Sequence, residues 1–222
     1  MKRTIAAAFL VFVLAGAGDT AATSSTFRLV TLGDSITSTQ VPNPNPCGVS
    51  WPGHLTFPVA HNAGIGGNDT AQMRARMATD VLPYHPTVVV VMGGTNDLHR
   101  GYPEATTLAN MADIVYQIRH SGALPIVLTI PPLRGTWDYA TPTLVMAYNR
   151  DLRAVAIAHG ALVIDTWALL ANSTGTWARA GDTCDGVHPT DAGGQIIADA
   201  VTAKFLSLSP PAIETCLPAA VR

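Results

Sequence analysis

The run Val-Val-Val-Val-Met-Gly-Gly at residues 88–94 indicates the fold class of this chain. Its five apolar residues are mostly β-branched and show no polar alternation. This pattern predicts a strand that is buried on both faces in the middle of a sheet, and the two glycines end it. Shorter apolar runs that end in turn residues predict the other strands: 27–32, 57–60, 123–130 and 161–164.

Helical patterns lie between these runs. The clearest covers residues 104–120, where apolar side chains at positions 108, 111, 114, 115 and 118 form one stripe. Further helices are expected at 70–82, 143–159 and 189–206. Strands that alternate with helices favour an α/β fold, in which a parallel sheet is covered on both faces. In such sheets, ligands bind beyond the carboxyl ends of the strands.

The amino-terminal residues have the pattern of a signal peptide. Met1-Lys2-Arg3 is followed by an uncharged apolar run and then by small residues, and the apolar run is short for a membrane span. We expect residues 1–22 to be removed, with cleavage after Ala17 or Ala22. An uncleaved membrane anchor fits the pattern less well. Residues 23–222 then form one domain of a secreted protein, which is extracellular or retained in the periplasm or at the cell surface.

The composition argues against two kinds of partner. The net charge is -2 and charged residues make up only 13% of the chain. This leaves no basic surface for nucleic acid or for anionic lipid. The oligomeric state stays open at this point, with a monomer favoured.

Polar clusters follow the expected strands. Gly-Asp-Ser-Ile at 33–36 follows the first strand, Asn-Ala-Gly-Ile-Gly-Gly-Asn at 62–68 the second, and Gly-Gly-Thr-Asn-Asp at 93–97 the third. Asp-Gly-Val-His-Pro at 185–189 lies near the end of the chain. Because the carboxyl ends of parallel strands share one edge, we expect these clusters to meet there.

In type and order, the clusters resemble the four sequence blocks of the GDSL or SGNH hydrolases. The resemblance extends from residue 27 to about residue 206, and Ile36 stands where the family name has leucine. It implies an esterase or lipase with a flavodoxin-like three-layer α/β/α fold around a mostly five-stranded parallel sheet. By matching position, it implies a nucleophile, two partners and three oxyanion donors: Ser35; Asp185 and His188; and Ser35 N–H, Gly67 N–H and the Asn96 amide.

The same residues suit ester hydrolysis by their own chemistry. The Ser35 hydroxyl needs a base to accept its proton, and a neutral histidine such as His188 has suitable basicity. Asp185, three residues earlier across a turn at Gly186, can orient the imidazole ring and stabilise its charged form. Asp182 is the second choice for this carboxylate.

A tetrahedral oxyanion requires hydrogen-bond donors that already point at it. Gly67 allows close approach of the backbone because it has no side chain, and Asn96 offers an amide N–H without adding charge. The reaction needs no metal and no organic cofactor, and no cysteine spacing indicates a zinc site.

Other polar residues near these clusters have structural interpretations. We expect Asp34 to cap the short helix that follows it. Asp97 is expected to shape the turn after the third strand. Candidates for the lining of the substrate pocket are Asp34, Pro132 and Arg134.

The three cysteines allow one disulfide in an exported protein. We expect Cys47 to pair with Cys184, because both lie on loops at the presumed active edge. Cys216 follows a helix that should run away from that edge.

The predicted function is therefore that of a secreted serine ester hydrolase, with short-chain or carbohydrate acyl esters favoured as substrates. Lipase or phospholipase action on longer acyl chains and thioester cleavage use the same chemistry. An alternative of another class is a secreted protein that binds a glycan or lipid without turnover. The complete set of candidate residues argues against this alternative.

Overall fold

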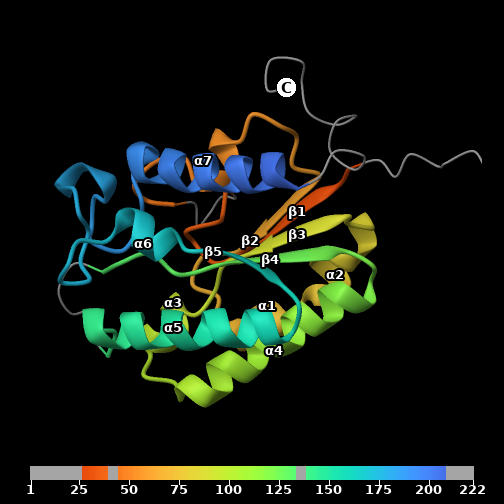
Figure 1. Cartoon of the computed structure of the whole chain (residues 1–222), viewed down its shortest axis with the longest axis horizontal. Helices are drawn as coiled ribbons and strands as arrows, with labels where there is room; N and C mark the ends of the chain where they lie inside the picture. Colours follow the sequence, from red (N-terminus) through yellow and green to blue (C-terminus); the bar gives the residue numbers. More distant parts are fainter. Residues whose placement is uncertain (1–26, 40–44, 134–138, 209–222) are drawn as a thin grey trace, which may run out of the picture.

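Five parallel strands form one sheet in the order β2-β1-β3-β4-β5 in the computed structural model (Figure 1). The structure describes residues 27–39, 45–133 and 139–208, so the predicted signal peptide, Arg134 and Cys216 lie outside the described residues. The strands are β1 (Leu29–Gly33), β2 (His61–Gly64), β3 (Val88–Val91), β4 (Leu124–Leu128) and β5 (Leu162–Ile164). The predicted α/β class and the five-stranded parallel sheet are confirmed.

The all-valine strand β3 lies at the centre of this sheet. It pairs with β1 on one side and with β4 on the other, and all four of its residues are buried. Burial on both faces explains why this strand has no polar alternation.

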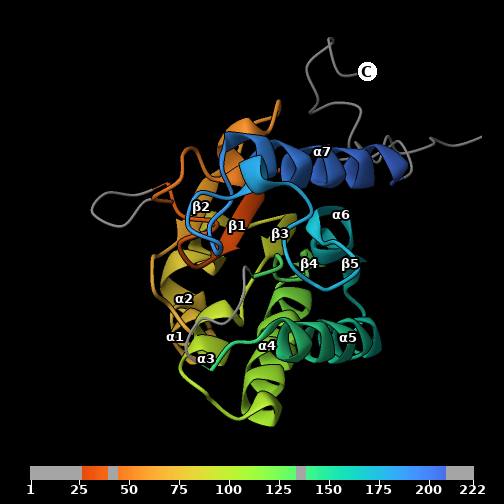
Figure 2. The same cartoon turned by 90° about the vertical axis from the view of Figure 1, so that its left-hand side faces the viewer.

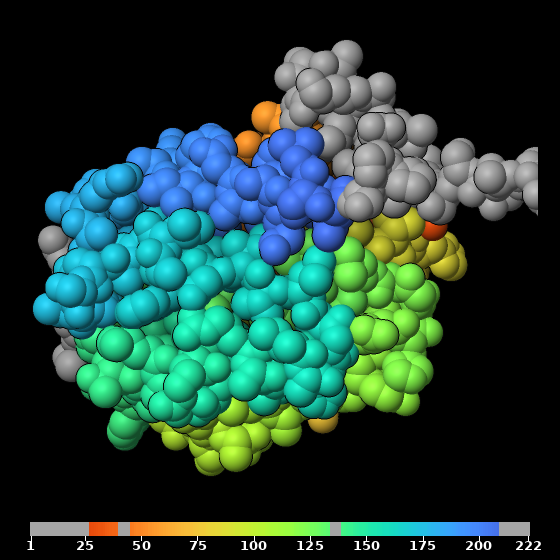
Figure 3. Space-filling model, in the orientation of Figure 1, coloured from red at the N-terminus to blue at the C-terminus, as the bar shows by residue number. Residues whose placement is uncertain are grey.

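Helices cover both faces of the sheet. One face carries α1 (Thr70–Ala75), α2 (Met77–Asp80), α4 (Glu104–His120) and α5 (Pro142–Ala158), and the other carries α7 (Asp191–Ser207) with the 3-10 helix η1 (Trp51–His54) (Figure 1). The remaining helical segments are α3 (Thr95–His99), α6 (Thr166–Leu170), η2 (Leu82–Tyr84) and η3 (Ala180–Asp182). In the space-filling view, α5 and the segments from α6 to α7, coloured green-cyan to blue, lie side by side on the surface (Figure 3).

The second strand lies further along the chain than the sequence predicted. Residues 57–60 precede β2, and His61–Gly64 pairs with β1 instead. Phe57 is buried because its ring packs edge-on against Phe27 and Phe205, with centroid distances of 6.1 and 5.1 Å. The apolar character of 57–60 therefore reflects a loop that buries Phe57 in the core and packs the partly buried Val59 against it.

The helix predicted at 70–82 is broken. Helix α1 ends at Ala75 and is followed by Arg76, where φ is -101° and ψ is 9°, and then by the short helices α2 and η2. The last helix begins at Asp191, with the Thr190 side chain accepting from Gly193 N–H, so Pro189 is not its first residue as predicted. The Pro189 carbonyl instead accepts a hydrogen bond from Asn45 Nδ2 at 2.8 Å.

Of the helices within residues 27–39, 45–133 and 139–208, none is both long and apolar enough to span a bilayer.

Candidate active site

Ser35 lies in a tight turn directly after β1, at the carboxyl edge of the sheet, which faces the viewer in Figure 2. The Asp34 carbonyl accepts from Thr37 N–H and Ser38 N–H, which folds residues 34–38 into a helical turn. Gly33 is needed at the end of the strand, because a Cβ there would lie 2.2 Å from Thr37 Oγ1. The turn leaves Ser35 only partly buried.

Two hydrogen bonds connect Ser35, His188 and Asp185 in series. Ser35 Oγ lies 2.8 Å from His188 Nε2, and His188 Nδ1 lies 2.6 Å from Asp185 Oδ2. The structure thus brings together the three residues predicted as nucleophile, base and orienting carboxylate, although 153 positions separate Ser35 from His188.

The loop that carries Asp185 and His188 is shaped by its own polar groups. Asp185 Oδ1 accepts from the backbone N–H groups of Val187 and His188, at 2.9 and 2.8 Å. Gly186 has φ of +90°, a conformation that favours glycine. Thr183 Oγ1 accepts from Gly186 N–H and donates to the His188 carbonyl. The Asp185 carboxylate therefore builds the turn with one oxygen and faces the imidazole with the other.

The environment of Asp185 favours its charged form. Partial burial raises the pKa of this carboxyl, but the N–H groups of His188 and Val187 and the His188 ring outweigh burial and hold the pKa below its usual range. Asp182, the second choice for this role, is nearly fully buried, and its carbonyl accepts from Thr190 N–H.

Asn96 joins three of the four polar clusters. Its Nδ2 donates to the Asn68 carbonyl at 3.0 Å and lies 3.4 Å from Asp34 Oδ2. Asn96 belongs to α3 and is only 7% exposed. Gly67, the residue before Asn68, has φ of +78°, and a Cβ added there would meet no atom within 4 Å. The backbone at Gly67 thus borders open space.

Asp34 lies beneath this cluster and is fully buried. Its Oδ1 accepts from Ile36 N–H at 2.9 Å, as expected for a capping residue. Burial raises the pKa of Asp34 from 3.8 to about 6, although the Ile36 N–H and the nearby His188 act in the opposite direction. Its burial makes Asp34 a support beneath the site. Pro132 is also buried, and its predicted place in the pocket lining stays a prediction.

Asp97 has a larger structural role than the predicted turn. Its carboxylate accepts from Thr70 N–H at 2.9 Å and from the Thr70 hydroxyl at 2.6 Å, so it joins the start of α1 to α3. Burial raises the pKa of Asp97, and the Thr70 donors oppose this effect.

Two arginines that the sequence analysis missed support the site from outside. Arg76 donates to the Gly33 carbonyl and to Asn68 Oδ1, both at 2.9 Å. Arg100 donates to the Gly67 carbonyl at 2.8 Å and to Asp69 Oδ2 at 3.0 Å. Arg76 stands three positions after the buried Met73, and an arginine on a buried helical stripe was the signal available in the sequence.

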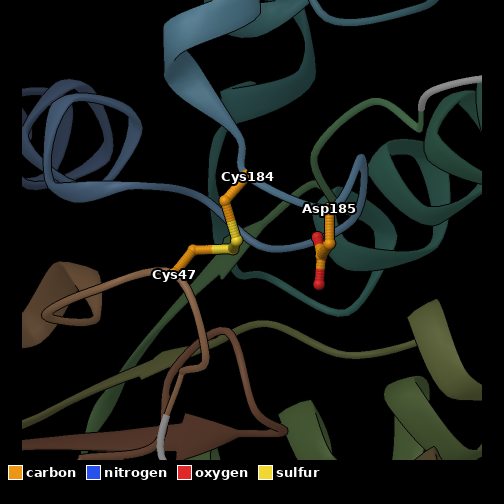
Figure 4. A group of neighbouring side chains, drawn as sticks. All are labelled: Cys47, Cys184 and Asp185. Atoms are coloured by element: carbon orange, nitrogen blue, oxygen red, sulfur yellow. A yellow bond between two sulfur atoms is a disulfide. The ribbon is translucent and has the colours of Figure 1, made fainter.

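Cys47 and Cys184 form a disulfide with a Cα–Cα distance of 5.5 Å, directly before Asp185 (Figure 4). One atom from each of Cys47, Cys184 and Asp185 lies within 4.8 Å of the other two. The bonded sulfurs are not thiolates, so this group offers a metal ion only the carboxylate. The disulfide instead joins the segment after residue 44 to the loop of Asp185 and His188.

The chain belongs to the GDSL-like Lipase/Acylhydrolase family, because the sequence model of that family matches residues 31–196. The matched region includes all four polar clusters, from Gly33 to Pro189.

Two curated relatives are similar to parts of the chain. An uncharacterised lipoprotein, YqeF of Bacillus subtilis, is 40% identical over 78 residues, which are 32% of this chain and 32% of the relative. An acetylxylan esterase of Geobacillus stearothermophilus is 30% identical over 153 residues, which are 63% of this chain and 68% of the relative. The chain therefore matches about a third of the length of the first relative.

The fold agrees with that of solved structures. A lipase/acylhydrolase from Enterococcus faecalis superimposes with a TM-score of 0.66 at 22% identity, covering 81% of this chain and 95% of the other. At this identity the likeness concerns the fold.

Proposed function

We propose that the protein is an exported carboxylic ester hydrolase that acts through Ser35, His188 and Asp185. The observation that carries the proposal is the unbroken series of short contacts from Ser35 Oγ through the imidazole to Asp185 Oδ2, at 2.8 and 2.6 Å. Family membership supports the same reaction class.

In the proposed acylation step, Ser35 Oγ attacks the ester carbonyl carbon while its proton moves to His188 Nε2. Asp185 holds Nδ1–H, which keeps Nε2 free to accept that proton and stabilises the imidazolium. The C–O bond of the ester then breaks, and His188 gives its proton to the leaving alcohol. An acyl group remains on Ser35.

Three hydrogen-bond donors are assigned to stabilise the negative charge of the tetrahedral intermediate: the N–H groups of Ser35 and Gly67, and the Asn96 amide. The bond from Asn96 Nδ2 to the Asn68 carbonyl supports this assignment, because it fixes the amide with one N–H before a substrate arrives. The second N–H makes only a long contact of 3.4 Å with Asp34 Oδ2, and in the proposed step it turns to the oxyanion. A donor of this kind typically contributes roughly a hundredfold to a thousandfold in turnover.

Deacylation repeats the chemistry with water as the nucleophile. His188 accepts a proton from the water, the hydroxide oxygen bonds to the acyl carbon, and the carboxylic acid leaves as Ser35 recovers its proton. Water is the only reactant added in this step.

We assign short-chain or carbohydrate acyl esters as the substrate class. The similarity to an acetylxylan esterase, 30% identical over 153 residues, favours this class. Lipase, phospholipase or thioesterase action on longer acyl chains would use the same residues, as would a retained pocket that binds a glycan or lipid without turnover. The length of the acyl group separates these functions in the assay below.

Export is part of the proposal. A disulfide between Cys47 and Cys184 suits an oxidising compartment, and residues 1–22 have the composition of a signal peptide. The amino terminus of the secreted protein, read by mass spectrometry, should begin at residue 18 or residue 23.

The test compares the wild type with Ser35→Ala on p-nitrophenyl esters from acetyl to palmitoyl. We expect the wild type to prefer the short esters. Removal of the nucleophile should lower kcat by up to about a millionfold while the variant stays folded. Ser121→Ala, at the end of α4 and away from the candidate site, is the matched control and should keep full activity. Equal activity of wild type and Ser35→Ala would show that Ser35 is not the nucleophile, and a preference for palmitoyl would support a lipase.

A further inference from the structure

Two exposed tyrosines lie on connections at the carboxyl edge of the sheet. Tyr102 is 45% exposed and follows α3, the helix that carries Asn96. Tyr139 is 68% exposed and lies between β4 and α5. Because β3 and β4 are neighbours in the sheet, the connections that leave their carboxyl ends emerge next to each other (Figure 2).

Tyr139 rests on the backbone of Gly101. A Cβ at Gly101 would lie 2.9, 3.0 and 3.3 Å from Cγ, Cδ2 and Cδ1 of the ring. These near-equal distances mean that the face of the ring meets the glycine. Gly101 also has φ of +68°, which any other residue would adopt at a cost. One face of the Tyr139 ring is thus supported, while most of the side chain stays exposed.

The exposed tyrosines elsewhere are arranged differently. Tyr84 stacks on His61 with a centroid distance of 4.0 Å, and Tyr116 stacks on His120 at 3.7 Å. Among the residues that the structure describes, no aromatic ring stacks on Tyr102 or Tyr139. The two tyrosines at the active edge therefore keep ring surface available for a ligand.

Tyr139, Gly101 and Tyr102 together form a platform, which lies close to the proposed oxyanion donors. Arg100, the residue before Gly101, donates to the Gly67 carbonyl at 2.8 Å. Arg100 N–H donates to the Asn96 carbonyl and Gly101 N–H to the Leu98 carbonyl, so Gly101 lies about one helical turn, roughly 5.4 Å, past Asn96. In this proposal, a group bound on Tyr139 is therefore a part of the substrate about one helical turn away from the reacting ester.

We propose that Tyr139, supported by Gly101 and flanked by Tyr102, binds a sugar ring in the alcohol portion of an acylated oligosaccharide. This inference rests on the proposed ester hydrolase function and names its substrate. A sugar ring presents C–H groups on its face, which suit the negative face of an aromatic ring, and its hydroxyl groups remain in water. A long acyl chain would instead gain most from an enclosed apolar groove, whereas these rings are exposed.

Support by Gly101 also lowers the entropic cost of binding. A free exposed side chain loses rotamer freedom when a ligand fixes it, while a ring already packed on backbone loses less. The contact should therefore act mainly on KM for a substrate that reaches the platform.

The experiment measures kcat/KM of wild type and Tyr139→Ala on a partially acetylated xylo-oligosaccharide and on ethyl acetate, whose alcohol carries no ring. We expect about a fivefold to tenfold loss on the oligosaccharide, carried by KM, because one aromatic stacking contact is lost. Activity on ethyl acetate should stay within about twofold, because its two-carbon alcohol has no ring to stack on Tyr139. Tyr139→Phe should restore the oligosaccharide activity. Tyr116→Ala, which removes an exposed tyrosine on α4, should change neither substrate.

Binding without turnover gives a second measurement. In the Ser35→Ala background, Tyr139→Ala should weaken the affinity for unacetylated xylo-oligosaccharide, measured by calorimetry. Unchanged affinity and unchanged KM on the oligosaccharide would overturn the inference while leaving the esterase function intact. A loss confined to octanoyl or longer p-nitrophenyl esters would overturn it in favour of an acyl-chain surface. A wild type that hydrolyses no ester would overturn the proposed function, and this inference with it.

Discussion

The proposed site has two halves that are held in place by different means. Ser35 and Asn96 directly follow β1 and β3, neighbouring strands whose residues are all buried. Asp185 and His188 lie on the connection between α6 and α7, which contributes no strand to the sheet. Hydrogen bonds and one disulfide position this second half, so the two halves should respond differently to the same kind of change.

Among changes within the loop half, Asp185→Asn should give the largest effect on turnover. It changes the proton position on the His188 ring while preserving the shape of the loop. The asparagine carbonyl can still accept from the N–H groups of Val187 and His188, as Asp185 Oδ1 does. Its NH₂ group would face His188 Nδ1, which favours the tautomer whose Nε2 cannot accept the Ser35 proton. We expect kcat to fall roughly 10⁴-fold at neutral pH with an unchanged circular dichroism spectrum.

Asp182→Asn is the matched control for this variant, since Asp182 lies in the same loop and competed for the same role in the sequence. Its kcat should stay within a few-fold of the wild type. A large loss in Asp182→Asn together with a small one in Asp185→Asn would reverse the two assignments.

Removal of the disulfide should affect the two halves of the site differently. The bond spans 137 positions, and the double variant Cys47→Ser/Cys184→Ser should lose about 2–5 kcal/mol of unfolding free energy. Hydrogen exchange at residues 183–190 should quicken, while β1 and β3 keep their protection, because the sheet packs without the bond. Activity should fall but persist, since Asn45 Nδ2 still holds the Pro189 carbonyl.

Cys216→Ser controls for the loss of a cysteine and should leave both stability and exchange unchanged. If exchange in the double variant quickens equally in β1 and in residues 183–190, the disulfide stabilises the whole fold instead of one half of the site.

The sheet half was the more predictable one. Strand β3 is recognisable because a strand buried on both faces must be apolar throughout. Strand β2 was misplaced because it lies at the edge of the sheet and contains His61 and Asn62, whereas the preceding loop carries the core residue Phe57. Apolar content reports burial, and burial does not separate a strand from a packed loop.

The positions of Ser35, Asn96, Asp185 and His188 could be anticipated because strand ends share one edge and the four polar clusters have a recognisable order. The contacts of Arg76 and Arg100 could not. Arg76 reaches a carbonyl 43 positions away, and Arg100 reaches one 33 positions away. Contacts of this kind depend on how α1 and α3 pack against the site. The helical stripe around Arg76 indicates burial, but it does not identify the groups that the arginine contacts.

The smallest expected effect concerns pH and has opposite signs in the two halves. Burial raises the pKa of Asp34 from 3.8 to about 6, so the folded state binds a proton that the unfolded state releases. The stability from that proton is complete below about pH 4 and is lost as the pH rises through about 6. The unfolding free energy of the wild type, relative to Asp34→Asn, should therefore fall by up to about 3 kcal/mol over this range.

The opposite sign is expected at Asp185, whose pKa lies below its usual range because it accepts from His188 and Val187 against the effect of burial. The unfolding free energy of the wild type relative to Asp185→Asn should be highest above about pH 4 and should fall as the pH is lowered, since acid protonates the carboxylate that builds the turn. Urea titrations of the three proteins from pH 3 to pH 7 measure both differences. A flat difference for Asp34→Asn would mean that the carboxyl has the same pKa in the folded and unfolded states, and that its neighbours offset burial completely. The two halves of the site would then differ in their connection to the sheet, and not in the charge states that they favour.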